Sequence, residues 1–167
     1  MNFSERTEFI SPAKSIYINE LVYEQKRRGK DIVVLSLGEA FFDLPSFEIS
    51  QEAIEQGYHY TDSRGLPDLR VKILEYLNSR HKVTGLSAEK NIIISAGSKV
   101  LTYISMLLTL DQGAEVILHE PAWLSYDQQA SLCGASVKFV HFNATLAEVA
   151  ENINKQTKLI IINNPNN

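Results

Sequence analysis

The stretch EVILHEPAWLSYDQQASLCGASVKFV, residues 115–140, indicates the fold of this chain. Two short apolar runs, at residues 115–118 and 136–140, flank a stretch of helical length. The same alternation continues on both sides, with strand-like runs at residues 91–94 and 158–162 and helical stretches near residues 98–110, 122–132 and 145–153. Because short apolar strands separated by helices form right-handed β-α-β units, we predict an α/β fold, a three-layer, mostly parallel sheet with helices on both faces.

The segment before this alternation also carries boundary signals. Pro12 opens a helical pattern that ends near Gly29, and residues 32–37 form an apolar run that predicts a short strand. Two further helices are expected, one capped by Ser46 and one beginning at Pro67. These patterns separate an N-terminal arm with an outer segment from the start of a larger α/β domain.

Composition limits the classes of function. Of the 167 residues, 44% are hydrophobic and 22% are charged, which is ordinary for a globular domain. The formal charge of −4 provides no basic surface for nucleic acid or anionic lipid. Cys133 is the single cysteine, which excludes an internal disulfide, and residues 1–10 lack the apolar core of a signal peptide. We therefore expect a cytoplasmic protein without nucleic-acid or membrane partners.

A turn of small residues follows the predicted strand at residues 91–94. Gly97, Ser98 and Lys99 stand at the start of the next helix, where backbone N–H groups and the helix dipole attract anions. The hydroxyl of Ser98 adds a donor, so the turn is a candidate phosphate site. The alternative is a turn that only connects two elements. No dinucleotide-binding or P-loop glycine motif occurs in the chain.

Aromatic and amide side chains follow the later strands. Trp123 comes just after the run at residues 115–118, and open parallel sheets bind ligands beyond the carboxyl ends of their strands. Its indole could stack on a flat heteroaromatic ring or pack between sheet and helix. Asn164, Asn166 and Asn167 follow the last strand and are either turn residues or polar anchors at the same crevice.

These segments together resemble the class I/II aminotransferases of pyridoxal-phosphate fold type I. A glycine–glutamate pair beginning at Gly38 and the stretch YTDSRGLPDLR at residues 60–70 add to the resemblance, which spans residues 33–167. It implies a pyridoxal-phosphate-dependent enzyme that transfers an amino group between an amino acid and a 2-oxo acid. It also assigns residues 1–45 to an N-terminal arm and small-domain segment, and residues 46–167 to the first part of the large cofactor-binding domain.

The resemblance implies cofactor contacts for individual residues. Gly97, Ser98 and Lys99 would hold the phosphate of pyridoxal 5'-phosphate. Trp123 would stack on the pyridine ring, and Asn167 would hydrogen-bond the phenolic oxygen of that ring. These roles agree with the chemistry expected of an anion at a helix start and a ring on an aromatic face.

Two further residues receive roles from the same resemblance. Tyr60 would reach the phosphate of the neighbouring subunit's cofactor, which implies a homodimer, and Gly38 would lie near the substrate carboxylate. The chain departs from the family's pattern beside Gly38, because residues 40–42 are Ala-Phe-Phe where members commonly have Pro-Asp-Phe. Loss of the proline loosens this turn.

The family's Schiff-base lysine, its aspartate at the pyridine nitrogen and its carboxylate-binding arginine lie beyond the equivalent of Asn167. We therefore expect an N-terminal fragment that is inactive alone and contains no catalytic residue. The same front half suits a carbon–sulfur lyase, a cyclopropane-forming relative or a non-catalytic binding module. The identity of the substrate amino acid stays open. The four histidines lack metal-ligand spacing with Cys133, so no metal site is predicted.

Overall fold

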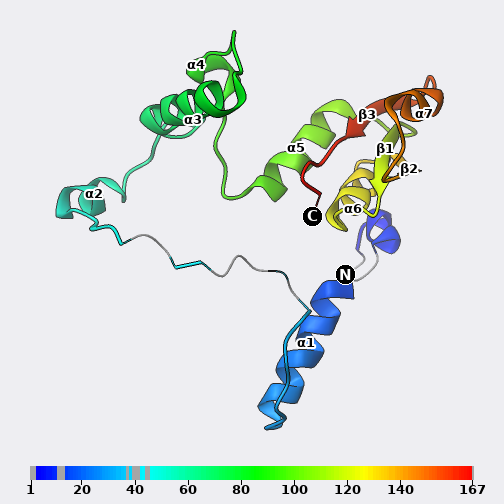
Figure 1. Ribbon diagram of the computed structural model, residues 1–167, viewed down its shortest axis with the longest axis horizontal. Helices are drawn as coiled ribbons and strands as arrows, with labels where there is room; N and C mark the ends of the chain where they lie inside the picture. The colour runs from blue at the N-terminus through cyan, green and yellow to red at the C-terminus, as the bar shows by residue number, and fades with distance from the viewer. Residues whose placement is uncertain (1–2, 11–13, 37, 39–41, 44–45, 167) are drawn as a thin grey trace. The chain divides into compact units, whose positions relative to one another are not determined.

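The computed structural model describes residues 3–10, 14–36, 38, 42–43 and 46–166. The chain forms two compact units, whose elements are labelled in Figure 1. We call Met1–Ala40 with Leu101–Asn167 the sheet unit and Phe41–Val100 the helical unit. The domain division predicted between residues 45 and 46 stays a prediction.

The sheet unit contains a three-stranded parallel sheet. Its strands are β1 (Glu115–Glu120), β2 (Ser136–His141) and β3 (Thr157–Ile161), in the order β2-β1-β3. β1 is therefore the central strand, and its residues Val116, Ile117 and Leu118 are fully buried. The apolar runs predicted from residue 115 onward are confirmed as strands with small shifts at their ends, and their parallel pairing is confirmed as well.

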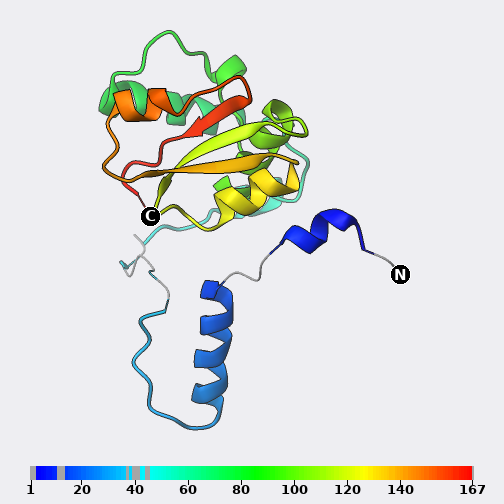
Figure 2. The same cartoon turned by 90° about the vertical axis from the view of Figure 1, so that its right-hand side faces the viewer.

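Helices cover both faces of this sheet, as predicted (Figure 2). They are α5 (Ser98–Thr109) and α6 (Ser125–Leu132) on one face and α7 (Leu146–Glu151) on the other. The faces follow from the alternation of side chains along β1. Val116 and Leu118 pack with Met106 of α5. Ile117 packs with Val149 of α7.

The short helix α7 begins with a capping box. The Thr145 hydroxyl oxygen accepts a hydrogen bond from the Glu148 backbone N–H at 3.3 Å, and the Glu148 carboxylate accepts one from the Thr145 backbone N–H at 2.7 Å. Hydrogen bonds from the backbone and the hydroxyl of Thr145 hold the pKa of Glu148 below its usual range. This cap fixes where the chain turns back towards β3.

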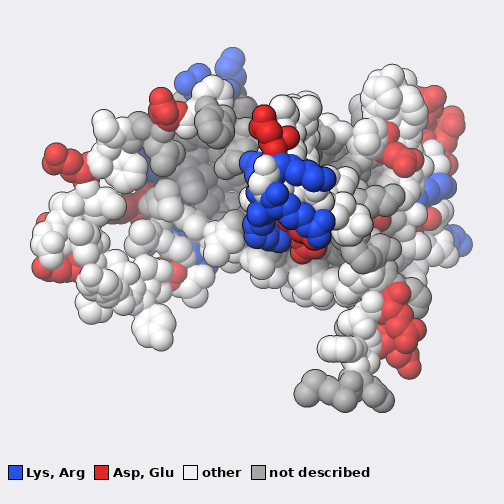
Figure 3. All heavy atoms as spheres, turned by 90° about the horizontal axis from the view of Figure 1, so that it is seen from below, with Lys and Arg blue, Asp and Glu red and all other residues white. Residues whose placement is uncertain are grey.

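Two further elements of the sheet unit precede the sheet in sequence. They are η1 (Glu5–Phe9), which packs against α6, and α1 (Lys14–Arg27). α1 confirms the helix predicted to end near Gly29, while Pro12 lies outside the described residues. Basic side chains gather at the end of α1 (Figure 3), where the Arg28 guanidinium pairs with the Glu24 carboxylate. Cations in this last turn complement the helix dipole.

The helical unit contains α2 (Gln51–Gln56), α3 (Pro67–His81) and α4 (Ala88–Asn91). α3 begins at Pro67 as predicted, and α4 packs against it. The predicted cap of the preceding helix is wrong. Ser50, rather than Ser46, accepts a hydrogen bond from the Ala53 backbone N–H, at 3.1 Å, and α2 begins after it.

Two predicted strands are not formed in the described part of the chain. Residues 32–36 join no sheet, the Leu35 side chain is 90% exposed, and residue 37 lies outside the described residues. In the run predicted at residues 91–94, Asn91 ends α4 and Ile92 is extended without a strand partner. An apolar, β-branched segment becomes a strand only when a neighbouring strand supplies its backbone hydrogen bonds, and neither segment has such a neighbour among the described residues.

Candidate functional site

A cavity of about 300 Å³ opens at the carboxyl ends of β1 and β3. Its lining includes His119, Ala122, Tyr126, Asn163, Asn164 and Asn166. Ligands of parallel sheets bind at this end of the strands. The cavity therefore lies where the sequence predicted a crevice, and Tyr126 is a lining residue that the sequence analysis did not assign to the site.

Asparagine side chains tie together the two segments that border this cavity. Asn166 Nδ2 donates to the backbone carbonyl oxygen of Pro121 at 2.9 Å, which joins the segment after β3 to the segment after β1. Asn163 Nδ2 lies 3.5 Å from Asn166 Oδ1, at the long limit of a hydrogen bond. In the present structure Asn166 therefore holds backbone, and the role of the asparagines as polar anchors for a ligand stays a prediction.

Trp123 lies in the segment between β1 and α6 and contacts Tyr126, which lines this cavity. Its ring centroid is 5.1 Å from that of Tyr126, and the two ring planes make an angle of 83°. A perpendicular contact fixes the orientation of the indole and engages at most one of its faces. The Trp123 side chain is half-buried, and its stacking on a cofactor ring stays a prediction.

The predicted phosphate turn, Gly97 to Lys99, belongs to the helical unit and overlaps the first turn of α5. Gly97 has a φ of +93°, and no heavy atom lies within 4 Å of a Cβ built on it. This left-handed conformation favours glycine. The Gly97 backbone N–H donates to the Ser95 carbonyl oxygen at 2.8 Å. In this structure the Gly97 N–H therefore closes the turn and does not point to an anion. Ser98 and Lys99 lie exposed in the first turn of α5.

A network of hydrogen bonds that the sequence analysis missed supports the segment before this turn. Arg70 of α3 is 4% exposed, and its Nη2 donates to Asp62 Oδ2 at 3.2 Å. Asp62 Oδ1 accepts from the Arg64 backbone N–H at 2.8 Å. The Arg64 carbonyl oxygen accepts from the Ile94 backbone N–H at 2.9 Å. The turn at residues 62–65 is therefore fastened to both α3 and the segment that leads to Gly97.

Substituting Gly65 by alanine is expected to destabilise the helical unit by about 1–3 kcal/mol more than the matched change at Gly85. Both glycines have positive φ, +96° and +78°. A Cβ at Gly65 would lie 2.6 Å from Ile94 Cβ, whereas nothing lies within 4 Å of one at Gly85. Urea unfolding measures the free energy of unfolding of both variants. The loss at Gly85 reports the strain of a positive φ, and the additional loss at Gly65 reports the steric contact with Ile94. Equal losses of stability in both would contradict the expected contact.

Acidification is expected to weaken the Asp62 network. The Arg64 backbone N–H and the nearby guanidinium groups of Arg70 and Arg64 hold the pKa of Asp62 below its ordinary value of 3.8. A carboxyl group whose pKa is lower in the folded than in the unfolded state contributes its full stabilisation of the folded state above the unfolded-state pKa. This contribution to the free energy of unfolding is lost as the pH falls through the folded-state pKa. The difference in thermal unfolding midpoint between the wild type and Asp62→Asn should therefore shrink below about pH 4. A difference that stays constant with pH would contradict this linkage.

Tyr60 and Gly38, the remaining predicted site residues that the structure describes, form none of the hydrogen bonds named above. Tyr60 is fully exposed within the helical unit. Gly38 is exposed, with no heavy atom within 4 Å of a Cβ built on it. Asn167 lies outside the described residues.

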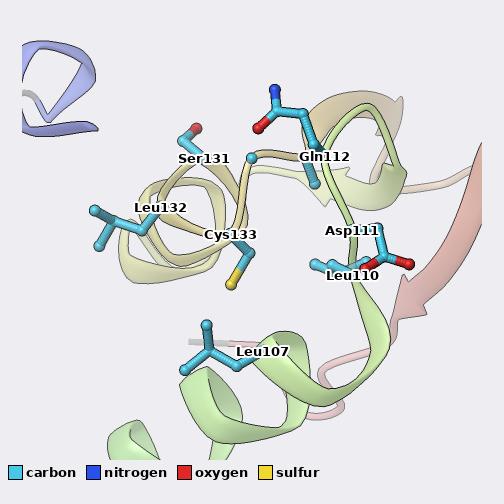
Figure 4. Close-up of a pocket in the computed structure, with 9 residues that line it drawn as sticks. Leu107, Leu110, Asp111, Gln112, Ser131, Leu132 and Cys133 are labelled. Atoms are coloured by element: carbon cyan, nitrogen blue, oxygen red, sulfur yellow. The ribbon is translucent and has the colours of Figure 1, made fainter. Parts of the chain in front are cut away.

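A second cavity, of about 470 Å³, lies at the amino ends of β1 and β2 (Figure 4). The Cys133 side chain points into it and faces Leu107 of α5, with Gln112 and Asp111 at its edge. None of the predicted site residues that the structure describes lines this cavity, whereas Asn164 and Asn166 line the cavity at the carboxyl ends of the strands.

Among the described residues, no cluster of His, Cys, Asp and Glu side chains could hold a metal ion. The helices of the described segments are too short or too polar to cross a membrane.

Residues 30–167 match the sequence profile of the family described as aminotransferase class I and II. The chain belongs to this family. Members of the aminotransferase class I and II family are enzymes that depend on pyridoxal phosphate and act on amino acids and keto acids. The resemblance found in the sequence motifs is thereby confirmed.

Individual relatives support the same assignment. The probable aspartate/prephenate aminotransferase of Aquifex aeolicus is 32% identical over 173 residues, and the aspartate aminotransferase of Pyrococcus horikoshii is 34% identical over 174 residues. Each alignment covers 98% of this chain and 43% of the relative. The solved aspartate aminotransferase of Thermus thermophilus with maleate is 28% identical with a TM-score of 0.88, over 100% of this chain and 46% of that one. This aminotransferase-family chain thus spans less than half the length of these relatives, and the predicted α/β fold is confirmed.

Proposed function

We propose that the protein containing these residues is a pyridoxal-phosphate-dependent aminotransferase, which transfers an amino group from an amino acid to a 2-oxo acid. The match of residues 30–167 to the family carries this proposal. The cavity at the carboxyl ends of β1 and β3, bordered by aromatic and amide side chains, supports it. Since the named relatives include aspartate aminotransferases, aspartate is the first amino donor to test.

The residues present suit the chemistry of this cofactor. A flat heteroaromatic ring needs an aromatic face, and Trp123 makes an edge-to-face contact with Tyr126, which lines the cavity. A phosphate needs backbone donors and a positive helix end, and the 12-residue helix α5 begins at Ser98 after a left-handed Gly97. We propose that Gly97, Ser98 and Lys99 hold the phosphate, that Trp123 stacks on the ring and that Asn167 bonds its phenolic oxygen.

The bound cofactor supplies an aldehyde that takes up the amino group and a ring that withdraws electrons from the reacting carbon. The residues of this chain would bind and orient it. Ser98 would donate its hydroxyl and backbone N–H to the phosphate, which fixes one end of the molecule. The indole of Trp123 would fix the plane of the ring. The apolar part of the cavity lining, such as Ile161 and Phe142, would keep water from the reacting atoms.

The assembly and location are also proposals. We propose a cytoplasmic homodimer in which Tyr60, fully exposed in its own unit, reaches the phosphate held by the other subunit. Gly38 would lie beside the substrate carboxylate. Residues 1–45 would serve as the arm and small-domain segment, and residues 46–167 as the first part of the large cofactor-binding domain.

The proposed activity is tested on the protein made from its complete reading frame. With pyridoxal phosphate, aspartate and 2-oxoglutarate, we expect equal amounts of glutamate and oxaloacetate to form. Release of ammonia and a thiol from a cysteine conjugate, without amino transfer, would assign a carbon–sulfur lyase. Tight cofactor binding without turnover of any of the twenty amino acids would assign a binding module and contradict the proposal.

A further inference from the structure

We propose that Asp62 and Arg70 are positioning residues for the cofactor phosphate, acting through the turn at residues 62–65 and the segment that leads to Gly97. The inference rests on the proposed function, because it takes Gly97 and Ser98 as the phosphate site. Neither Asp62 nor Arg70 is proposed to touch the phosphate. Residues 62–65, Arg70, Gly97 and Ser98 all lie within the helical unit.

Arg70 joins three segments of the helical unit through one side chain. It is the only buried residue of α3. Its Nη2 donates to Asp62 Oδ2 at 3.2 Å, and its Nη1 lies 3.4 Å from the Ala88 carbonyl oxygen and 3.5 Å from that of Glu89. A guanidinium group has rigid, planar donors, so it fixes its partners in one geometry. Arg70 thereby holds the 62–65 turn, α3 and α4 together.

Asp62 also stabilises the turn at residues 62–65 through its second carboxylate oxygen, Oδ1. Its Oδ1 accepts from the Arg64 backbone N–H at 2.8 Å, and its carbonyl oxygen accepts from the Gly65 backbone N–H at 2.8 Å. The Arg64 carbonyl oxygen, presented by this turn, accepts from the Ile94 backbone N–H at 2.9 Å. The Arg64 guanidinium bonds in addition to the Glu89 carbonyl oxygen. Ile94 is therefore anchored by the turn that Asp62 and Arg70 define.

Ile94 lies three residues before Gly97 and is bound to the 62–65 turn. Gly65 approaches it so closely that a Cβ at Gly65 would lie 2.6 Å from Ile94 Cβ. After Ile94 the chain passes directly to Ser95, whose carbonyl oxygen binds the Gly97 N–H at 2.8 Å. A shift of Ile94 therefore moves the backbone of Gly97 and the start of α5. Hydrogen bonds to a phosphate depend steeply on such shifts.

The burial of Arg70 argues for a positioning role rather than for stability alone. Burying a guanidinium group is unfavourable unless all its donors are paired, and Arg70 Nε has no hydrogen-bond partner among the described residues. An apolar side chain of similar volume would fill the same space without this cost. The Asp62 side chain is 35% exposed, so water can solvate its carboxylate when Arg70 is replaced. Arg70→Met should therefore fold as well as the wild type.

The test measures dissociation constants for pyridoxal phosphate and for pyridoxal, which lacks the phosphate, on the protein from its complete reading frame. In Asp62→Asn and Arg70→Met, we expect affinity for pyridoxal phosphate to fall about tenfold, the value of one hydrogen bond to a charged group. Affinity for pyridoxal should stay at the wild-type value in both variants, and the thermal unfolding midpoint of Arg70→Met should stay at the wild-type value as well. Lys72→Met is the matched control, because it removes an exposed ion pair with Glu75, at 3.0 Å, from the same helix. It should change neither affinity.

Each other outcome overturns the inference. If both variants keep the wild-type preference for pyridoxal phosphate over pyridoxal, Asp62 and Arg70 do not position the phosphate turn. If both ligands lose affinity equally while the unfolding midpoint falls, the two residues are only structural. If the wild type itself shows no preference for pyridoxal phosphate, the proposed function fails, and the inference fails with it. The wild-type measurement thus distinguishes the two kinds of failure.

Discussion

Replacing Ser98 by glutamate is expected to abolish pyridoxal phosphate binding, with a loss of affinity of at least about 100-fold. Ser98 is the first residue of α5, where the phosphate is proposed to bind. Two like charges about 4 Å apart near a protein surface repel by about 4 kcal/mol, more than a 100-fold loss requires. A glutamate in the first turn also complements the helix dipole, so the helix itself should remain folded. Equilibrium dialysis or calorimetry measures the loss.

The matched control for this change lies on the same helix. Ser105 is exposed in α5, and its hydroxyl donates to the Leu101 carbonyl oxygen at 2.8 Å. Ser105→Glu adds the same charge away from the helix start, and we expect its affinity for pyridoxal phosphate to be within about twofold of the wild type, because exposed charges are strongly screened. If Ser98→Glu binds as tightly as this control, the anion site is misplaced.

Truncating Ile117 to alanine is expected to lower the free energy of unfolding by about 2–5 kcal/mol. Ile117 is 0% exposed in the central strand and packs with Val140 and Val149. The change removes apolar contacts and leaves a cavity that the flanking strands cannot fill without breaking their ladder. Urea unfolding, followed by circular dichroism, measures the loss. Such a loss could leave little folded protein at 37 °C, so the measurement is best made in the cold.

Leu146 supplies the comparison for the core substitution. Its side chain is 82% exposed at the start of α7, so alanine there should change the stability by no more than about 0.5 kcal/mol. Losses of similar size at Leu146 and Ile117 would show that the sheet between α5, α6 and α7 is not the core of the sheet unit.

The fold was predictable where strands have neighbours close in sequence. Val116 and Ile117 lie in a short apolar run flanked by polar residues, and the next run follows after one helix, which suffices to predict parallel pairing. The runs at residues 32–37 and 91–94 have the same composition but no partner strand among the described residues. Periodicity reports which residues favour an extended backbone, and it contains no information on whether a neighbour is present.

Part of the candidate site was visible in the sequence as well. The anion site proposed at Gly97 was predicted from the known binding of anions at helix starts. The crevice near Trp123 was predicted from the known binding of ligands at the carboxyl ends of parallel strands. The Asp62–Arg70 pair was missed although a signal existed. Arg70 falls on the same face of α3 as Ile73, at helical spacing, and a charged residue on an apolar face indicates a buried partner. That partner comes from a turn, whose position single-sequence patterns do not predict.

The most direct test of the central claim is a crystal structure of the protein from its complete reading frame with pyridoxal phosphate. We expect the phosphate within hydrogen-bond distance of the Ser98 hydroxyl and backbone N–H at the start of α5, with the ring stacked on Trp123. A phosphate bound elsewhere, with Ser98 and Trp123 free of the cofactor, would contradict the account.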